Sequence, residues 1–204
     1  KKLKGQGAVQ NIQQRYQKVQ YEDYYDDLIW EEQPKNKVEL IKVFPKTIVN
    51  YVKGMPFGYS VNPYQGCEHG CSYCYARPSH EYWGYSSGMD FESKILVKKN
   101  APDLLRRELA SRAWVPKPIL LSGNTDCYQP ADQNFKITRE LLKIALEFRQ
   151  PIGIITKNSL ILRDLDILSE LQKRNLIRVT MSITSLDEST RRILEPRTAS
   201  CKNR

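Results

Sequence analysis

The chain has 204 residues, of which 40% are hydrophobic, and it carries a formal net charge of +9. This composition is sufficient for a buried core and excludes an intrinsically disordered chain. No run of about eighteen apolar residues occurs, so no membrane span is expected. The first residues also lack the apolar region of a secretory signal. We therefore predict a cytoplasmic protein with no membrane contact, either one domain or part of a larger one.

The net positive charge favours a polyanionic partner such as nucleic acid. The basic residues, however, are not confined to one segment. They form separate short clusters, at 98–99, 106–107, 191–192 and 202–204. An ordinary basic surface therefore remains open as the alternative.

Residues 1 to about 36 are polar and rich in glutamine, and they become acidic and aromatic between Tyr21 and Trp30. Low hydrophobicity predicts disorder at the start, whereas the aromatic half is expected to pack on the rest of the chain. Residues 38–43 and 47–52 contain enough β-branched residues to predict two short strands, or a hairpin interrupted at Pro45. We assign residues 1–53 to an amino-terminal arm with a structural role.

Three of the five cysteines, Cys67, Cys71 and Cys74, lie within one short loop. Thiolates favour zinc, copper(I) or iron–sulfur clusters. A closed zinc site takes four protein ligands and an ordinary four-iron cluster takes four cysteines, so three thiolates leave one metal position open for chemistry. A zinc site completed by His69 or His80 is the alternative, and His80 is the better placed because His69 lies inside the loop. A disulfide is less favoured, because three clustered cysteines leave an odd thiol.

From residue 60 onward, short apolar strands alternate with amphipathic helices, a pattern typical of βα units and a parallel sheet. A short apolar run at 95–97 precedes the first helix. The predicted strands are 59–62, 118–122, 152–155 and 177–183, and the predicted helices are 101–112, 138–149, 164–174 and one beginning near Asp187. Polar residues after the carboxyl ends of such strands are candidates for function.

The C-x3-C-x2-C spacing, with Tyr73 before the last cysteine, resembles the cluster loop of the radical SAM superfamily. The flanking strings, 60–66 and 75–78, are similar to the spore photoproduct lyase and DNA repair photolyase-like branch. The resemblance implies that the three thiolates hold three irons of a 4Fe-4S cluster and that S-adenosylmethionine (SAM) chelates the fourth. Electron transfer to SAM then yields a 5′-deoxyadenosyl radical that abstracts hydrogen, with a flavodoxin-like or ferredoxin-like protein as electron donor.

The same resemblance implies a partial parallel (β/α) barrel of six units, of which residues 54–204 contain about four. We therefore expect a barrel truncated before its fifth strand. We also expect the strand at 177–183 to be an uncovered edge. DNA repair is the activity associated with the branch, so a nucleic-acid lesion is one candidate substrate, although the residues themselves name none.

The resemblance also assigns SAM contacts at the strand ends. Thr125 and Asp126 match a hydroxyl and aspartate pair that holds the SAM amino group, with a capping turn as the alternative. Lys157 matches the residue that pairs with the SAM carboxylate, although a loop lysine is ordinarily solvated. Ser182, with Thr184, is placed to contact the ribose.

Tyr73 is expected to support the adenine and Tyr75 to face the substrate, with ordinary packing as the alternative for both. Cys127 is offset from the position, near Gly123, at which spore photoproduct lyase carries its hydrogen-donating cysteine. We therefore predict a buried free cysteine there. The function class that rivals the radical SAM enzyme is a non-catalytic zinc or iron–sulfur module that binds nucleic acid.

Overall fold

The structure is a computed structural model that describes residues 5, 7–8, 10–12, 15–16, 38–54 and 57–204. The strands are β1 (Glu39–Val43), β2 (Val49–Tyr51), β3 (Tyr59–Val61), β4 (Tyr64–Gln65), β5 (Lys94–Lys98), β6 (Ile119–Leu121), β7 (Ile152–Thr156) and β8 (Ile177–Met181). The helices are α1 (Asp90–Ser93), α2 (Ala101–Leu109), α3 (Ala131–Phe135), α4 (Ile137–Glu147), α5 (Leu165–Lys173) and α6 (Glu188–Leu194), with 3₁₀ helices η1 (Arg77–Trp83), η2 (Ser159–Asp164) and η3 (Cys201–Asn203). The acidic and aromatic stretch 21–30, which we predicted to pack on the rest of the chain, lies outside the described residues.

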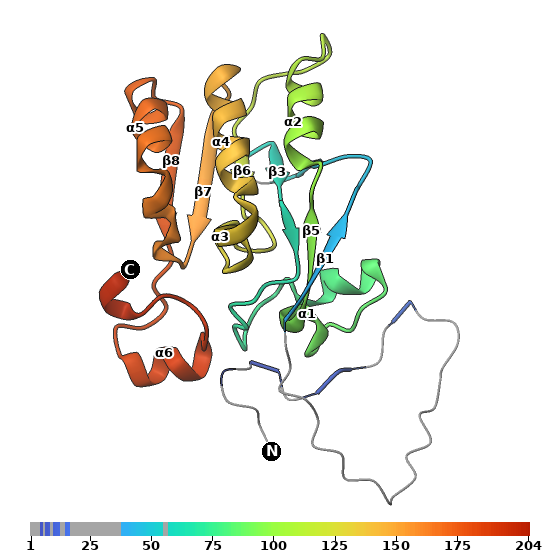
Figure 1. Cartoon of the computed structure of the whole chain (residues 1–204), viewed down its shortest axis with the longest axis vertical. Coiled ribbons are helices and arrows are strands. Elements are labelled where there is room, and N and C mark those ends of the chain that lie inside the picture. The colour runs from blue at the N-terminus through green and yellow to red at the C-terminus, as the bar shows by residue number, and fades with distance from the viewer. Residues whose placement is uncertain (1–4, 6, 9, 13–14, 17–37, 55–56) are drawn as a thin grey trace, which may run out of the picture.

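A five-stranded sheet in the order β2-β3-β6-β7-β8 forms the centre of the molecule (Figure 1). Strands β3, β6, β7 and β8 are parallel, with Val61 opposite Leu121 and Leu121 opposite Ile154. These are the four strands predicted from the alternating pattern. The predicted α/β class with a parallel sheet is therefore confirmed.

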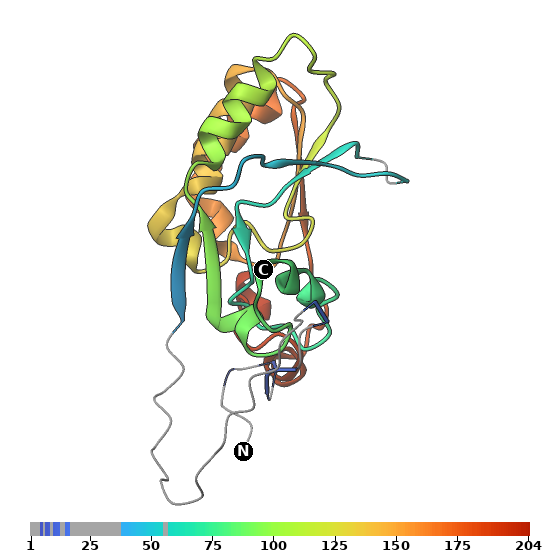
Figure 2. The ribbon, with the colours of Figure 1, turned by 90° about the vertical axis from the view of Figure 1, so that its right-hand side faces the viewer.

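Helices α2, α4 and α5 cover one face of this sheet (Figure 2). Their apolar residues recur at helical spacing, which places one stripe of each helix against the strands. On α2 that stripe is Leu104, Leu105 and Leu109, all of them buried. The helix also begins with Pro102 in its first turn, where the missing N–H costs nothing.

The predicted hairpin between 38–43 and 47–52 is wrong, although both strands exist. Strand β1 pairs in parallel with β5, in a separate three-stranded sheet of order β1-β5-β4. Strand β2 pairs antiparallel with β3. The apolar side chains of β5, from Ile95 to Val97, are all buried, so β5 takes the central place and β1 covers one side of it. The predicted domain boundary at residue 53 stays a prediction. Both strands of the amino-terminal arm pair with strands that follow residue 53.

The carboxyl ends of the parallel strands point to one end of the molecule, where the loop after β4 and helix α6 also lie (Figure 1). The segment from η1 to α1 lies at the same end. Its Glu92 accepts hydrogen bonds from the backbone N–H groups of Gly7 and Ala8, at 3.0 and 2.7 Å. Residues near the amino terminus are therefore fastened to the region around the cysteine loop.

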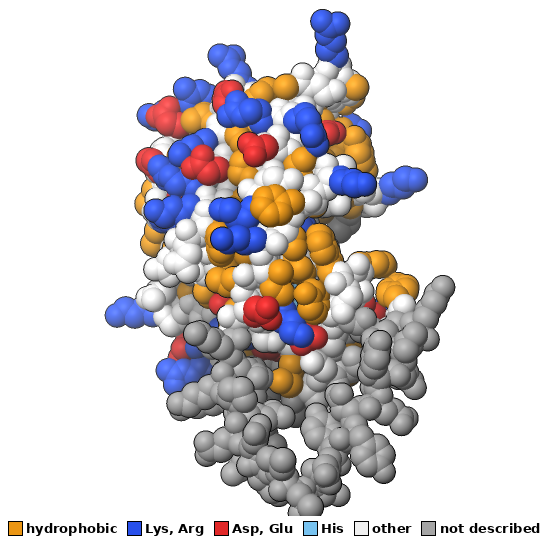
Figure 3. All heavy atoms as spheres, turned by 45° about the vertical axis from the view of Figure 1, so that its right-hand side comes forward, with side chains coloured by type: hydrophobic (Ala, Val, Ile, Leu, Met, Phe, Trp, Pro, Cys, Tyr) orange, Lys and Arg blue, Asp and Glu red, His pale blue; other side chains and the backbone are white. Residues whose placement is uncertain are grey.

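Charged side chains of both signs are present on one face of the molecule (Figure 3). On the face shown in Figure 3, Lys and Arg side chains are scattered among acidic and hydrophobic ones. A continuous basic patch is not visible on this face. Among the described residues, no helix is both long enough and apolar enough to cross a membrane.

Strand β8 forms hydrogen-bonded pairs with β7 and lies at the end of the strand order. Apolar side chains near it are open to solvent, with Val179 45% and Ile183 49% exposed. An uncovered strand edge with apolar side chains is a template for pairing with another chain. We expect the 204-residue chain to self-associate through β8, with a light-scattering mass that rises with concentration.

A charge on the edge should oppose this pairing. Val179→Lys is therefore expected to return the chain to a monomer, while Val115→Lys, at another exposed valine outside β8, should leave the association unchanged. A monomeric wild-type chain with full hydrogen-exchange protection along β8 would contradict the expectation.

Candidate radical SAM site

The three clustered cysteines lie on a loop that runs from the end of β4 to η1. Two glycines allow the loop to turn, since Gly66 and Gly70 have positive φ angles of 80° and 64°. A Cβ at Gly70 would also lie 2.5 Å from an Oε2 atom of Glu92. Any other residue at Gly70 would therefore be strained by its backbone and would displace this buried carboxylate.

Cys67 and Cys71 are buried and Cys74 is half-buried, and all three are free thiols. Burial raises the pKa of the Cys67 thiol well above its usual value, and the carboxylate of Asp126 raises it further. Burial also raises the pKa of Cys71, to about 12. Because thiolates are the metal ligands, a metal bound here must displace protons from the thiols.

One pocket of about 340 Å³ joins this loop to the strand ends. It is lined by residues from the cysteine loop and from the exits of β6, β7 and β8, three strands that are far apart in the sequence. Most residues predicted to hold the cluster, SAM or substrate line it, namely Cys67, Cys71, Cys74, Tyr73, Tyr75, Thr125, Asp126, Lys157 and Ser182. Thr184, which was predicted beside the ribose together with Ser182, is not among the described residues that line it.

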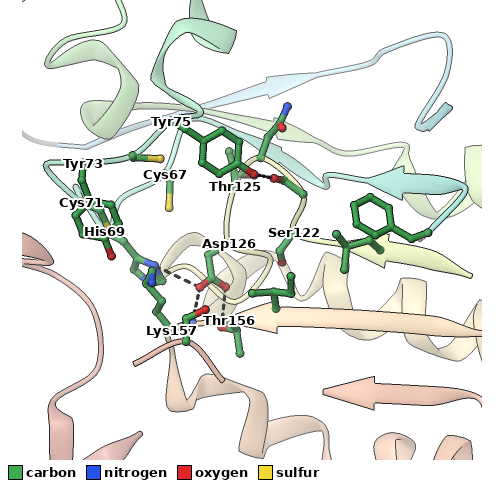
Figure 4. Close-up of a pocket in the computed structure, with 17 residues that line it drawn as sticks. Cys67, His69, Cys71, Tyr73, Tyr75, Ser122, Thr125, Asp126, Thr156 and Lys157 are labelled. Atoms are coloured by element: carbon green, nitrogen blue, oxygen red, sulfur yellow. Dashed lines mark hydrogen bonds and ion pairs between the residues drawn. The ribbon is translucent and has the colours of Figure 1, made fainter. Parts of the chain in front are cut away.

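Asp126 is surrounded by donors from the chain itself (Figure 4). One carboxylate oxygen accepts the Thr156 hydroxyl at 2.7 Å and the Tyr128 N–H at 2.9 Å. The other accepts the Lys157 N–H at 2.7 Å and lies 3.4 Å from Nδ1 of His69. A carboxylate has about four acceptor sites, so these contacts occupy most of its capacity.

The predicted contact of Asp126 with the SAM amino group therefore stays a prediction. In the structure, Asp126 connects the exit of β6 to the end of β7 through its hydrogen bonds with Thr156 and Lys157. Thr125, which was predicted to hold the same amino group, also forms a hydrogen bond within the chain. The Thr125 side chain is buried and its hydroxyl donates to the Tyr64 carbonyl at 2.9 Å.

Lys157 lies at the end of β7 with its ammonium beside the pocket. Its Nζ forms an ion pair of 3.0 Å with Glu195 and lies 5.8 Å from the centre of the Tyr73 ring. Burial alone lowers the pKa of Lys157, but the hydrogen bond and charge of Glu195 outweigh burial, so the pKa is raised. Lys157 is therefore protonated and remains a cation for an anionic ligand.

Glu195 belongs to this site although the sequence did not predict it. It follows α6, has a fully buried side chain, and accepts hydrogen bonds from Tyr73 and Thr184 as well as from Lys157. These hydrogen bonds outweigh burial and lower its pKa to about 2. No motif in the sequence marks it, because it follows a helix rather than a strand. Thr184, predicted beside the ribose, contacts Glu195 instead.

The two histidines occupy different environments. His69 lines the pocket and contacts Asp126 and Asn158, and burial lowers its pKa. His80 packs between Tyr85 and Phe91 and is not among the described residues that line the pocket. Within the part of the chain that the structure describes, no three His, Cys, Asp or Glu side chains surround a point suited to a single metal ion. Thiolates of a cluster bind separate irons and do not have to meet at one metal ion, so these three thiols fit a cluster better than a zinc ion.

Cys127 is fully buried and is not among the described residues that line the pocket. Its N–H donates to the Ser122 hydroxyl at 2.8 Å, and Ser122 has a positive φ of 75°. The predicted buried free cysteine is confirmed. Gly123, at the position expected of a hydrogen-donating cysteine in the resembling branch, does line the pocket.

Comparisons with solved structures reveal the same fold in spore photoproduct lyase. Its complex with dinucleoside spore photoproduct matches with a TM-score of 0.61 over 83% of this chain and 46% of that chain, at 18% identity. A variant of the same enzyme with bound AdoMet and dinucleoside spore photoproduct also matches with a TM-score of 0.61. At this identity the likeness concerns the fold.

Sequence relatives include an uncharacterized protein of Mycobacterium tuberculosis, 34% identical over 76% of this chain and 46% of its own length. Another, from Methanocaldococcus jannaschii, is 32% identical over 79% of this chain and 58% of its own length. The chain thus spans about half the length of the curated relatives it matches. The family model of the radical SAM superfamily matches residues 61–203, from the end of β3 to η3. With this match and the lyase fold, the chain belongs to the radical SAM superfamily.

Proposed function

We propose that the chain binds a 4Fe-4S cluster through Cys67, Cys71 and Cys74, binds SAM in the adjoining pocket, and starts its reaction by hydrogen abstraction. The observation that carries the proposal is the convergence of three thiols and the Lys157 ammonium on one pocket. When bound, the cluster would supply the electron that cleaves SAM to methionine and a 5′-deoxyadenosyl radical. Family membership and the lyase fold support an enzyme; the cofactors are our inference from these residues.

The chain's own residues would bind and orient SAM. The Lys157 cation is suited to the SAM carboxylate, because a hydrogen bond between charged groups is stronger than a neutral one. Ser182 lines the same pocket, and a hydroxyl there suits the ribose. The exposed faces of Tyr73 and Tyr75, 49% and 78% exposed, offer aromatic surface for adenine and for substrate.

The rival function is a metal-binding module without catalysis. A zinc site would need a fourth ligand at the same point as the three thiols. His69 is engaged with Asp126 and Asn158, while His80 packs among aromatic rings away from the pocket. These contacts favour the cluster over zinc.

Nucleic acid is the substrate class we propose, supported by the net charge of +9 and by a fold shared with an enzyme solved with a dinucleoside. A nucleic-acid lesion is the corresponding substrate. A flavodoxin-like or ferredoxin-like reductant remains our prediction for the electron donor.

The test is SAM cleavage. Protein reconstituted anaerobically with iron and sulfide, then given SAM and dithionite, should form 5′-deoxyadenosine, and omission of dithionite should prevent it. The Cys127→Ala variant should still form 5′-deoxyadenosine, because Cys127 is not among the described residues that line the pocket. A protein that holds its iron but cleaves no SAM would support the non-catalytic module instead.

A further inference from the structure

Glu195 lies behind the pocket wall and connects two residues that face the pocket. Its carboxylate is 3.0 Å from Lys157 Nζ and accepts a hydrogen bond from the Tyr73 hydroxyl. Both partners line the pocket, whereas Glu195 is not among the described residues that do. Any effect of Glu195 on ligand binding therefore acts through Lys157 and Tyr73.

The carboxylate is itself held firmly. Thr184 donates to it at 2.5 Å and Arg204 at 2.7 Å, and the Arg191 guanidinium donates to the Glu195 carbonyl at 2.9 Å. Immediately before it, the Leu194 carbonyl accepts the Ser72 N–H at 2.9 Å. The turn that carries Glu195 is therefore fastened to the cysteine loop.

Glu195 is shared by two cations. Lys157 and Arg204 both pair with its carboxylate, and the side chains of Arg204 and Glu195 are fully buried. Lys157 lines the pocket, where its backbone N–H donates to Asp126. Glu195 thus holds the lysine that an anionic ligand in the pocket would meet.

We propose that Glu195 is a positioning residue for SAM, which fixes the Lys157 ammonium and the Tyr73 ring on the pocket wall before SAM arrives. A lysine that is already ordered loses less conformational freedom when its ligand binds. An ammonium has three donors, so Lys157 keeps donors for a carboxylate while it stays bonded to Glu195. This inference rests on the proposed function, since SAM is the ligand.

The experiment is a double-mutant cycle on SAM affinity, measured by equilibrium dialysis on the full chain at equal iron content. Glu195→Gln should weaken SAM binding about tenfold when Lys157 is present, which is the size expected for a hydrogen bond to a charged group. In a Lys157→Ala background, Glu195→Gln should weaken SAM binding less than about twofold, because its effect passes through Lys157. Equal losses in the two backgrounds, or tighter binding by Glu195→Gln, would overturn the proposal.

Two further variants separate positioning from folding. Glu140→Gln removes a carboxylate that pairs with Lys143 on α4, and it should leave SAM affinity unchanged. Glu195→Asp keeps the charge beside the buried Arg204 but withdraws the carboxylate by about 1.5 Å, the length of one C–C bond. It should weaken SAM binding in the same background-dependent way, and wild-type affinity in Glu195→Asp would count against the proposal.

A measurement on metal-free protein keeps the inference distinct from the proposed function. Acetylation of Lys157 by an activated ester, followed by mass spectrometry, should be faster in Glu195→Gln, because the hydrogen bond that holds the amine is weakened. Lys173, which is paired with Glu170 on α5, is the internal reference. An unchanged Lys157 rate refutes the positioning role alone, whereas wild-type protein that binds iron but no SAM refutes the proposed function.

Discussion

Replacing Cys67, Cys71 or Cys74 by alanine should abolish iron binding, while the wild-type chain should take up about four irons on anaerobic reconstitution. All three thiols line the same pocket, and each would hold a different iron. Loss of one thiolate leaves two of the four irons without a protein ligand, so we expect loss of the whole cluster rather than a partial one. Iron and sulfide analysis, with absorbance near 400 nm, measures the result.

The matched controls are the two cysteines outside the pocket lining. Cys127 is buried behind the β6 exit, and the Cys201 thiol donates to the Ser185 carbonyl at 3.3 Å. Cys127→Ala and Cys201→Ala should both keep their iron. Iron loss in Cys127→Ala as complete as in Cys71→Ala would refute the ligand assignment.

The second large effect is expected at Glu92, whose side chain is fully buried between Arg77, at 3.0 Å, and Arg197, at 2.8 Å. Glu92→Ala removes the shared partner of both guanidinium groups and of the Gly7 and Ala8 N–H groups. Breaking a buried ion pair typically costs about 3–5 kcal/mol, so the free energy of unfolding should fall by this amount. Urea unfolding of the metal-free chain measures it.

Glu92→Ala should also weaken iron retention, because Arg77 donates to the Cys71 carbonyl at 2.9 Å and holds the cysteine loop. Glu147→Ala is the control, since its ion pair with Arg106 is about half exposed and should contribute little to stability. Equal unfolding midpoints for the two variants would show that Glu92 does not stabilise the loop.

The parts of the site that could be predicted are those that local sequence encodes. The three cysteines lie within eight residues of one another, so their spacing alone indicates a metal-binding loop. Lys157 and Ser182 were located because apolar strands directly precede them and parallel strands end at one edge of a sheet. Helices α2, α4 and α5 and the start of α6 were predicted to within a few residues, because their apolar stripes are regular, whereas the short helices α1 and α3 were not predicted.

The parts that could not be predicted depend on contacts between distant segments. Glu195 meets Tyr73 across 122 positions, and no local pattern encodes that contact. Strand propensity identified β1 and β2 but not their partners, so the predicted hairpin was wrong. Asp126 was recognised as a polar strand-end residue, whereas its role as connector depends on Thr156 and Lys157 of the next strand.

The partners of Glu92 set an order of events during synthesis of the protein. Gly7 and Ala8 leave the ribosome before Glu92, whereas Arg197 follows it by 105 positions. Only when Arg197 has emerged can the carboxylate take up all of its contacts, and only then is the cysteine loop held from both sides. A nascent chain that ends before Arg197 therefore lacks one of the two guanidinium groups that pair with Glu92, and its cysteine loop lacks the Arg197 N–H that donates to the His69 carbonyl.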